Sequence, residues 1–198
     1  MSRVYLDANI ILAKSAGLEK EPRQFSQAEE IFNKIRDGEI EAVVSPLTLM
    51  EVRNSLRINH GKEIEILAGM EKSQRLEYVL KKSEDDYNAI LGELLRMGDK
   101  VIFKVKKNID MNQILDDAVE IIMGIKGKTK SYRDCKKCGT ENVNYIAFKS
   151  LGTDDALHAL LAKEMDCDQL LTFDGDFNEI KGNPKIGSLD IQVIEQRF

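Results

Sequence analysis

The sequence predicts an α/β fold: a three-layer α/β/α arrangement in which helices cover both faces of a central, mostly parallel sheet. Short apolar or β-branched runs recur along the 198-residue chain and are typical of strands. The longer segments between them carry apolar residues at helical spacing, with capping residues before several of them and glycines after. Strands that alternate with helices form parallel sheets, because each connecting helix packs on a face of the sheet before the next strand begins.

The N-terminal part of the chain predicts a strand, a helix and a second strand. Residues 4–6 are apolar and end at Asp7. Ser26 and Glu29 form a capping box, which predicts the start of the helix. The β-branched segment 40–44 follows as the second strand.

Ser45 caps the next predicted helix and Pro46 takes its first position, where the missing N–H does no harm. Glu51 falls in the second turn of this helix. The charged segment 62–97 has recurrent Leu, Ile and Met and predicts two helices that break near Ser83.

The C-terminal part continues the alternation of strands and helices. Its predicted elements are a strand at 101–105, a helix at 111–123, a loop at 124–152, a helix that Thr153 caps and that runs to 165, and strands at 170–173 and 191–194. We therefore expect a single domain over residues 1–198, with a helical insertion at 62–98 and a basic loop at 125–152.

The composition, with 42% hydrophobic and 32% charged residues, is that of an ordinary soluble globular protein. The net charge of −5 argues against a broad basic surface that coats nucleic acid, although it allows a local basic groove. The apolar stretches are too short to cross a bilayer, and we expect no secretory signal and no membrane partner. Three cysteines, an odd number, do not make a disulfide framework, so we expect a cytoplasmic protein.

Four acidic residues lie where predicted strands end or helices begin. Asp7 and Asp174 follow apolar runs, Asp155 lies in a first helical turn and Glu51 in a second. Because the carboxyl ends of parallel strands meet at one edge of a sheet, we expect these carboxylates to converge there. Buried carboxylates need a cation, and oxygen ligands favour Mg²⁺ or Mn²⁺. Singly, each acid also has an ordinary interpretation as a turn former or helix-dipole complement.

Four segments that contain these acids resemble the PIN-domain nucleases. The segments are LDANIIL at 6–12, SPLTLMEV at 45–52, DALHA at 155–159 and LLTFDGDF at 170–177. The resemblance implies a metal-dependent endoribonuclease with a central parallel sheet, similar to VapC-type toxins, whose partners are an RNA substrate and an antitoxin protein. It places Asp7, Glu51, Asp155 and Asp174 as the catalytic and metal-binding acids. We also expect a homodimer.

Asn9 and Thr172 match the supporting polar residues of that family, and we expect them to orient carboxylates rather than to bind the metal. The segment between Glu51 and Asp155 is longer than in most small toxins of the family. This difference bears on the toxin role more than on the fold or the metal site.

Two of the four acids have a neighbour that competes for the same role. Asp154 competes with Asp155, which we prefer because it directly precedes a row of alanines at helical spacing. Asp176 competes with Asp174, which we prefer for its spacing after the preceding strand. Asp176 would then contribute through a water molecule.

Cys135 and Cys138 form a CxxC motif, which is half of a structural zinc site. One hypothesis is that two chains each donate this pair to a Cys₄ zinc site at a dimer interface, and the alternative is a plain pair of thiols. A purified protein without zinc would exclude the site. Cations around Tyr132 either contact RNA phosphates or belong to a solvated loop. These cations are Lys126, Lys128, Lys130, Arg133, Lys136 and Lys137.

The two histidines have ordinary interpretations. His158 lies one turn after Asp155, and we expect a plain helix residue rather than a member of the site. His60 lies near the end of the Glu51 helix, where a cation complements the helix dipole.

Three other functions compete with that of a toxin nuclease. One is a catalytically quiet PIN-like module that binds RNA or protein, against which the presence of all four acids counts. Another is an RNA-processing nuclease outside toxin–antitoxin systems. The third is a phosphatase-like hydrolase with an Asp nucleophile, which generally has a second Asp two residues on, where this chain has Asn9.

Overall fold

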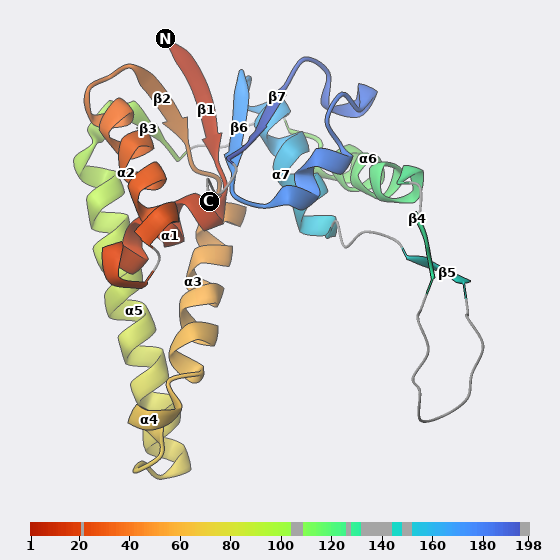
Figure 1. Ribbon diagram of the computed structural model, residues 1–198. Coiled ribbons are helices and arrows are strands. Elements are labelled where there is room, and N and C mark those ends of the chain that lie inside the picture. The colour runs from red at the N-terminus through yellow and green to blue at the C-terminus, as the bar shows by residue number, and fades with distance from the viewer. Residues whose placement is uncertain (21, 104–108, 126–127, 132–143, 148–151, 195–198) are drawn as a thin grey trace.

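The computed structural model contains a five-stranded sheet in which all strand pairs are parallel (Figure 1). The structure describes residues 1–20, 22–103, 109–125, 128–131, 144–147 and 152–194. The strands lie in the order β3-β2-β1-β6-β7, and their bounds are Ser2–Leu6 for β1, Ile40–Val43 for β2, Val101–Ile102 for β3, Gln169–Thr172 for β6 and Asp190–Val193 for β7. Helices pack on both faces of this sheet, which confirms the predicted α/β/α fold.

Alternate residues of the strands point to opposite faces of the sheet and build two cores. Val4 and Leu6 of β1 belong to one core, and Tyr5 between them belongs to the other. The first core includes residues of α1 (Ala8–Lys20), α2 (Pro22–Arg36) and α5 (Lys72–Arg96). The second includes residues of α6 (Met111–Gly124) and α7 (Thr153–Glu164).

Two helices connect β1 to β2, and the sequence predicted only the second. Helix α2 begins at Pro22, so the predicted capping box of Ser26 and Glu29 is wrong. Pro is favourable in the first turn of a helix, and the Ser26 hydroxyl donates to the Pro22 carbonyl from inside the helix. Glu29 instead forms ion pairs with Lys14 and Arg36.

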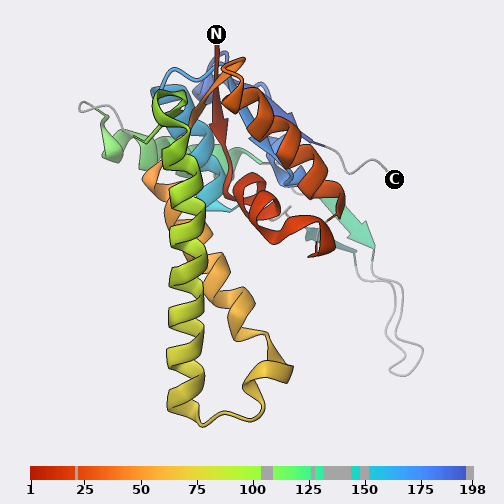
Figure 2. The same cartoon turned by 90° about the vertical axis from the view of Figure 1, so that its left-hand side faces the viewer.

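An arm of three helices connects β2 to β3 and projects from the body (Figure 2). The arm consists of α3 (Pro46–Gly61), α4 (Ile64–Leu67) and α5. Ser45 caps α3, as predicted, and its Oγ accepts from the Thr48 N–H at 3.1 Å. The predicted break near Ser83 is wrong, because α5 is continuous there. The buried Ser83 hydroxyl donates to the Val79 carbonyl within the helix, so it does not end the helix.

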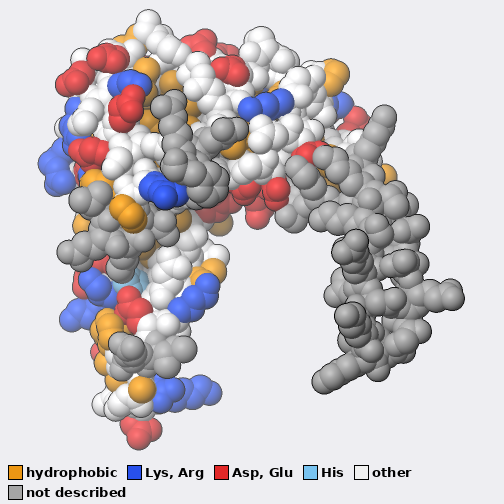
Figure 3. All heavy atoms as spheres, viewed as in Figure 1, with side chains coloured by type: hydrophobic (Ala, Val, Ile, Leu, Met, Phe, Trp, Pro, Cys, Tyr) orange, Lys and Arg blue, Asp and Glu red, His pale blue; other side chains and the backbone are white. Residues whose placement is uncertain are grey.

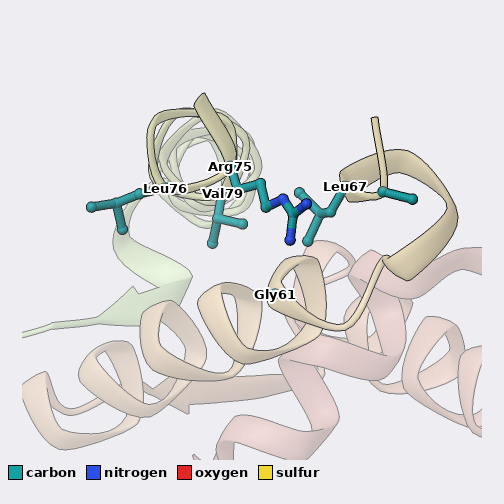
Figure 4. A pocket seen from close by; sticks show the side chains of 6 residues that line it. Gly61, Leu67, Arg75, Leu76 and Val79 are labelled. Atoms are coloured by element: carbon teal, nitrogen blue, oxygen red, sulfur yellow. The ribbon is translucent and has the colours of Figure 1, made fainter. Parts of the chain in front are cut away.

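A pocket lies near the tip of the arm, between α3 and α5 (Figure 4). Its described lining consists of Gly61, Leu67, Ala68, Arg75, Leu76 and Val79. Arg75 extends into the space between the helices and donates to the Met70 carbonyl at 2.7 Å. The lining residues that the structure describes include no carboxylate.

The segment 124–152 was predicted as a loop, and part of it is not. Strands β4 (Lys128–Ser131) and β5 (Asn144–Ala147) form an antiparallel pair within it. The CxxC cysteines and most of the cations around them lie outside the described residues, as do residues 104 and 105 of the predicted third strand. Helix α7 then begins at Thr153, and its cap is Gly152 rather than Thr153.

In the part of the chain that the structure describes, none of the helices is both long and apolar enough to span a membrane.

Candidate active site

The candidate site lies at the C-terminal edge of the sheet, where β1 and β6 end side by side. Within the sheet, β2 and β3 lie on one side of β1, and β6 and β7 lie on the other. Connections therefore leave β1 and β6 in different directions, which opens a crevice at the strand ends. Leu6 pairs with Leu171, and the Asp7 N–H donates to the Leu171 carbonyl at 3.1 Å. This register makes Asp7 and Thr172 neighbours.

The carboxylate of Asp7 is buried, with 6% of the residue exposed, and is held by three donors. Its Oδ1 accepts from the Ala8 N–H at 2.6 Å, and its Oδ2 accepts from Asn9 Nδ2 at 2.7 Å and from the Thr172 hydroxyl at 2.6 Å. Burial raises the pKa of Asp7, while the charge of His158 and the hydrogen bonds from Thr172 and Ala8 oppose this rise. The hydrogen bonds therefore fix the carboxylate in place, but they and His158 do not fully offset the cost of burying its negative charge.

Asn9 and Thr172 orient the acid, as the resemblance implied. Asn9 Nδ2 also donates to Thr172 Oγ1 at 2.9 Å, and Asn9 Oδ1 accepts from the Phe173 N–H at 3.0 Å. Thr172 is fully buried and its hydroxyl accepts from the Asp174 N–H at 2.9 Å while donating to Asp7. One hydroxyl thus links the ends of both strands.

Asp174 follows β6 and caps a short 3₁₀ helix, η2 (Gly175–Glu179). Its Oδ1 accepts from the Asp176 N–H at 2.8 Å. The side chain is half-buried and lies close enough to Asp155 to raise the pKa of that carboxyl group. Among the described residues, none donates a hydrogen bond to the other carboxylate oxygen of Asp174, Oδ2.

Glu51 of α3 and His158 of α7 meet across the site. His158 Nε2 lies 2.7 Å from Glu51 Oε2, and only 1% of the histidine is exposed. Because a carboxylate only accepts, Nε2 carries the proton and donates it. Burial opposes the charged form of His158, but the hydrogen bond to Glu51 and the charges of Asp7, Glu51 and Asp155 outweigh burial and raise the pKa of this histidine.

Behind the histidine lies a buried chain of hydroxyl groups. His158 Nδ1 lies 2.7 Å from the Tyr5 hydroxyl, which lies 2.6 Å from Ser45 Oγ. The Thr48 hydroxyl also donates to the Tyr5 oxygen at 3.2 Å. Burial raises the pKa of Tyr5, so the phenol stays protonated. The chain connects β1, the cap of α3 and α7, and it fixes the imidazole that holds Glu51.

Asp155 lies in the first turn of α7, where its Oδ2 accepts from the Gly152 N–H at 2.7 Å. Burial raises the pKa of Asp155 to about 6, and the negative charges of Asp174 and Asp7 add to this rise. The Gly152 hydrogen bond and the charge of His158 oppose it. The neighbouring Asp154 is exposed.

The raised pKa of Asp155 predicts a pH-dependent response to metal. Protonated Asp155 stabilises the metal-free fold below pH 4, and this contribution is lost as the pH rises through about 6. A bound cation offsets the negative charge that then develops. At one fixed Mn²⁺ concentration, about 100 times the Kd at pH 7.5, we expect Mn²⁺ to raise the Tm by roughly 5 °C or more at pH 7.5 and by much less at pH 5, in differential scanning fluorimetry. Equal shifts at both pH values would contradict this expectation.

Among the described residues, Asp7, Glu51 and His158 each place one ligand atom within 4.8 Å of the others. Asp155 and Asp174 do not belong to this group, although Asp155 interacts electrostatically with Asp174, Asp7 and His158. No Lys or Arg of the described chain forms an ion pair with any of the four acids. Partly buried negative charge that no Lys or Arg of the described chain offsets fits a divalent cation, and a donor set of carboxylates suits Mg²⁺ as well as Mn²⁺.

His158 takes a part in the site that the sequence did not lead us to expect. Its position three residues after Asp155 was the available signal, because residues three apart share a helix face. The expectation of a plain helix residue is wrong, since His158 is buried against Glu51 and Tyr5. His60, at the end of α3 as expected, is likewise buried and lies between two carboxylates of the arm.

No protein-family model matches the chain, and no curated protein matches it significantly. Among solved structures, a similar chain is found in the crystal structure of VapBC2 from Rickettsia felis bound to a DNA fragment from their promoter. The two chains are 13% identical, with a TM-score of 0.44. The alignment covers 98% of this chain and 99% of the other.

Proposed function

We propose that this protein is an endonuclease that uses a divalent cation, Mg²⁺ or Mn²⁺, to hydrolyse phosphodiester bonds of RNA. One observation carries the proposal: Asp7, Glu51 and His158 each place a polar side-chain atom within 4.8 Å of the others, beside Asp155 and Asp174, at the strand ends where α/β sheets bind ligands. Hydrolysis of a phosphodiester is favoured by positive charge close to the phosphate, and an anionic site of this kind can bind the divalent cation that supplies that charge.

Each residue of the site has a part that follows from its contacts. Asp7 and Glu51 hold the cation, with Asp155 and Asp174 completing the anionic set. Asn9 and Thr172 keep the Asp7 carboxylate in one orientation. A bound divalent cation supplies the charge that activates water and stabilises the phosphodiester transition state.

His158 is a positioning residue in this proposal, because it acts through Glu51. Its Nε2–H donates to one oxygen of that carboxylate and leaves the other oxygen for the cation. Hydrogen bonds from outside the ligand set commonly fix metal-binding carboxylates in this way.

RNA as the substrate, a toxin role and an antitoxin partner are supported by the four sequence segments that resemble PIN-domain nucleases. The homodimer belongs to the same proposal. An RNA-processing nuclease outside toxin–antitoxin systems would use the same site. A quiet RNA- or protein-binding module is disfavoured by the complete set of acids, since a module without activity has no need to bury uncompensated carboxylates.

Metal removal tests the proposal directly. We expect the purified protein to cleave an end-labelled single-stranded RNA in Mn²⁺ or Mg²⁺, to lose at least about 1,000-fold in rate with excess EDTA, and to recover when Mn²⁺ is restored. Denaturing gel electrophoresis of the products measures the rate. Binding of RNA without cleavage in any divalent metal would support the quiet module, and cleavage that EDTA leaves unchanged would contradict a metal-dependent mechanism.

A further inference from the structure

An open groove of about 490 Å³ runs from the candidate site along α3. Its described lining consists of Leu47, Met50, Glu51, Arg53, Asn54, Arg57 and Asp154. Glu51 belongs to the site, and Asp154 directly precedes Asp155. The groove, called the α3 groove below, is therefore continuous with the anionic site.

Leu47, Met50, Asn54 and Arg57 follow one another at three or four positions and form a row along one side of α3. Glu51 and Arg53 flank this row. The opposite face, with Val52, Leu56 and His60, packs into the body and the arm. At a rise of about 1.5 Å per residue, Arg57 lies about 9 Å along the axis from Glu51. That distance corresponds to roughly two or three stacked nucleotides at about 3.4 Å each.

The two arginines of the groove differ in their contacts. Arg53 pairs with Glu84 of α5 and lies over the ring of Tyr87, 5.6 Å from its centroid. Arg57 is exposed, and no described carboxylate forms an ion pair with it. Among the described lining residues, Arg57 is thus the cation that is free to bind an anion. Figure 3 shows Lys or Arg side chains on the inner side of the arm, below acidic side chains of the body.

A free cation beside an anionic site has a particular use for a nucleic-acid substrate. The chain carries a net charge of −5, and the site acids repel phosphates on either side of the one that the cation neutralises. A guanidinium a few nucleotides away offsets that repulsion and positions the strand. Met50, which is 68% exposed, adds apolar surface at the mouth of the groove, and Asn54 adds a hydrogen-bonding amide.

We propose that the α3 groove binds the single-stranded RNA that flanks the scissile phosphate, with Arg57 contacting a backbone phosphate. This inference rests on the proposed function, since it takes the site at Glu51 as the place of cleavage. Contacts to phosphate position a strand without reading its bases, so the groove contributes affinity rather than sequence preference.

Charge removal at Arg57 tests the inference. We expect Arg57→Gln to weaken binding of a fluorescent single-stranded RNA about tenfold in Ca²⁺, and to reduce the slope of log K against log salt by about 0.7. Arg57→Lys should keep most of the slope because it keeps the charge. The matched control is Arg96→Gln, an exposed arginine in the last turn of α5 near the opposite edge of the sheet, which should bind RNA as the wild type does. Fluorescence anisotropy measures binding, and isothermal titration calorimetry with Mn²⁺ should give the same metal affinity for all variants.

The outcomes separate this inference from the proposed function. If Arg57→Gln binds RNA as tightly as Arg96→Gln while the wild type cleaves RNA in Mn²⁺, the groove assignment is overturned and the nuclease stands. If Arg57→Gln lowers Mn²⁺ affinity as well as RNA affinity, Arg57 supports the metal site and the groove assignment is again overturned. A wild-type protein that neither binds nor cleaves RNA would overturn both proposals.

Discussion

Asp7→Asn is expected to lower the rate of RNA cleavage by at least about 1,000-fold, because the substitution removes the charge of the most buried carboxylate of the site. The amide can still accept from the Ala8 N–H, but it has no negative charge to bind a cation. It also places an NH₂ group where Oδ2 now accepts from Asn9 and Thr172. Both effects reduce metal affinity, so raising the Mn²⁺ concentration should recover little of the rate.

Asp37→Asn is the matched control for this variant. Asp37 is exposed at the end of α2, near the edge of the sheet opposite the site, and its substitution should leave cleavage unchanged. Circular dichroism and the Tm of both variants separate loss of activity from loss of fold. An Asp7→Asn protein that folds and still cleaves RNA at more than a tenth of the wild-type rate would show that the catalytic site lies elsewhere.

His158→Ala is expected to weaken Mn²⁺ binding about 10- to 100-fold, since loss of a residue that orients a metal ligand typically costs this much. The substitution leaves Glu51 without its donor and the Tyr5 hydroxyl without one of its partners. Isothermal titration calorimetry measures the affinity without reference to activity. Tyr5→Phe, which keeps the imidazole but removes its hydrogen bond at Nδ1, should weaken metal binding less than His158→Ala does.

The other histidine of the chain provides the control. His60 is also buried, with 5% exposed, and lies 2.9 Å from Glu63 Oε1 and 2.8 Å from Asp86 Oδ2 in the arm. His60→Ala should therefore lower the Tm about as much as His158→Ala does, because both substitutions leave partly buried polar groups unpaired. It should not change the Mn²⁺ affinity. Equal Mn²⁺ affinities for His158→Ala and the wild type would remove His158 from the site.

Local sequence patterns predicted the fold well wherever a residue type strongly favours one position in a helix or strand. Pro46 after Ser45 marks a helix start because no other arrangement uses both residues so well, and the structure confirms that cap. Ser26 and Ser83 misled, since serine favours helix caps but also bonds to the preceding turn inside a helix.

The acids were predictable one by one, and their surroundings were not. Asp7, Glu51, Asp155 and Asp174 were singled out by their positions after strands and in helical turns together with the resemblance of the surrounding segments, and their role stays a prediction. The buried chain from Ser45 through Tyr5 to His158 joins residues that lie 40 and 153 positions apart, and only the three-dimensional packing brings them together. The same holds for the α3 groove, since the sequence does not tell which arginine of α3 pairs with α5.

The hydroxyl of Thr172 joins the ends of β1 and β6, although Thr172 lies 165 residues after Asp7 in the sequence. Because synthesis runs from the N-terminus, Asp7 is made long before Thr172. The Asp7 carboxylate therefore cannot gain this hydroxyl until the chain has been synthesised through β6. His158 is also made long after Glu51, the acid to which it donates. A nascent chain that stops short of α7 therefore contains Asp7 and Glu51 without the side chains that hold these two acids in the folded protein.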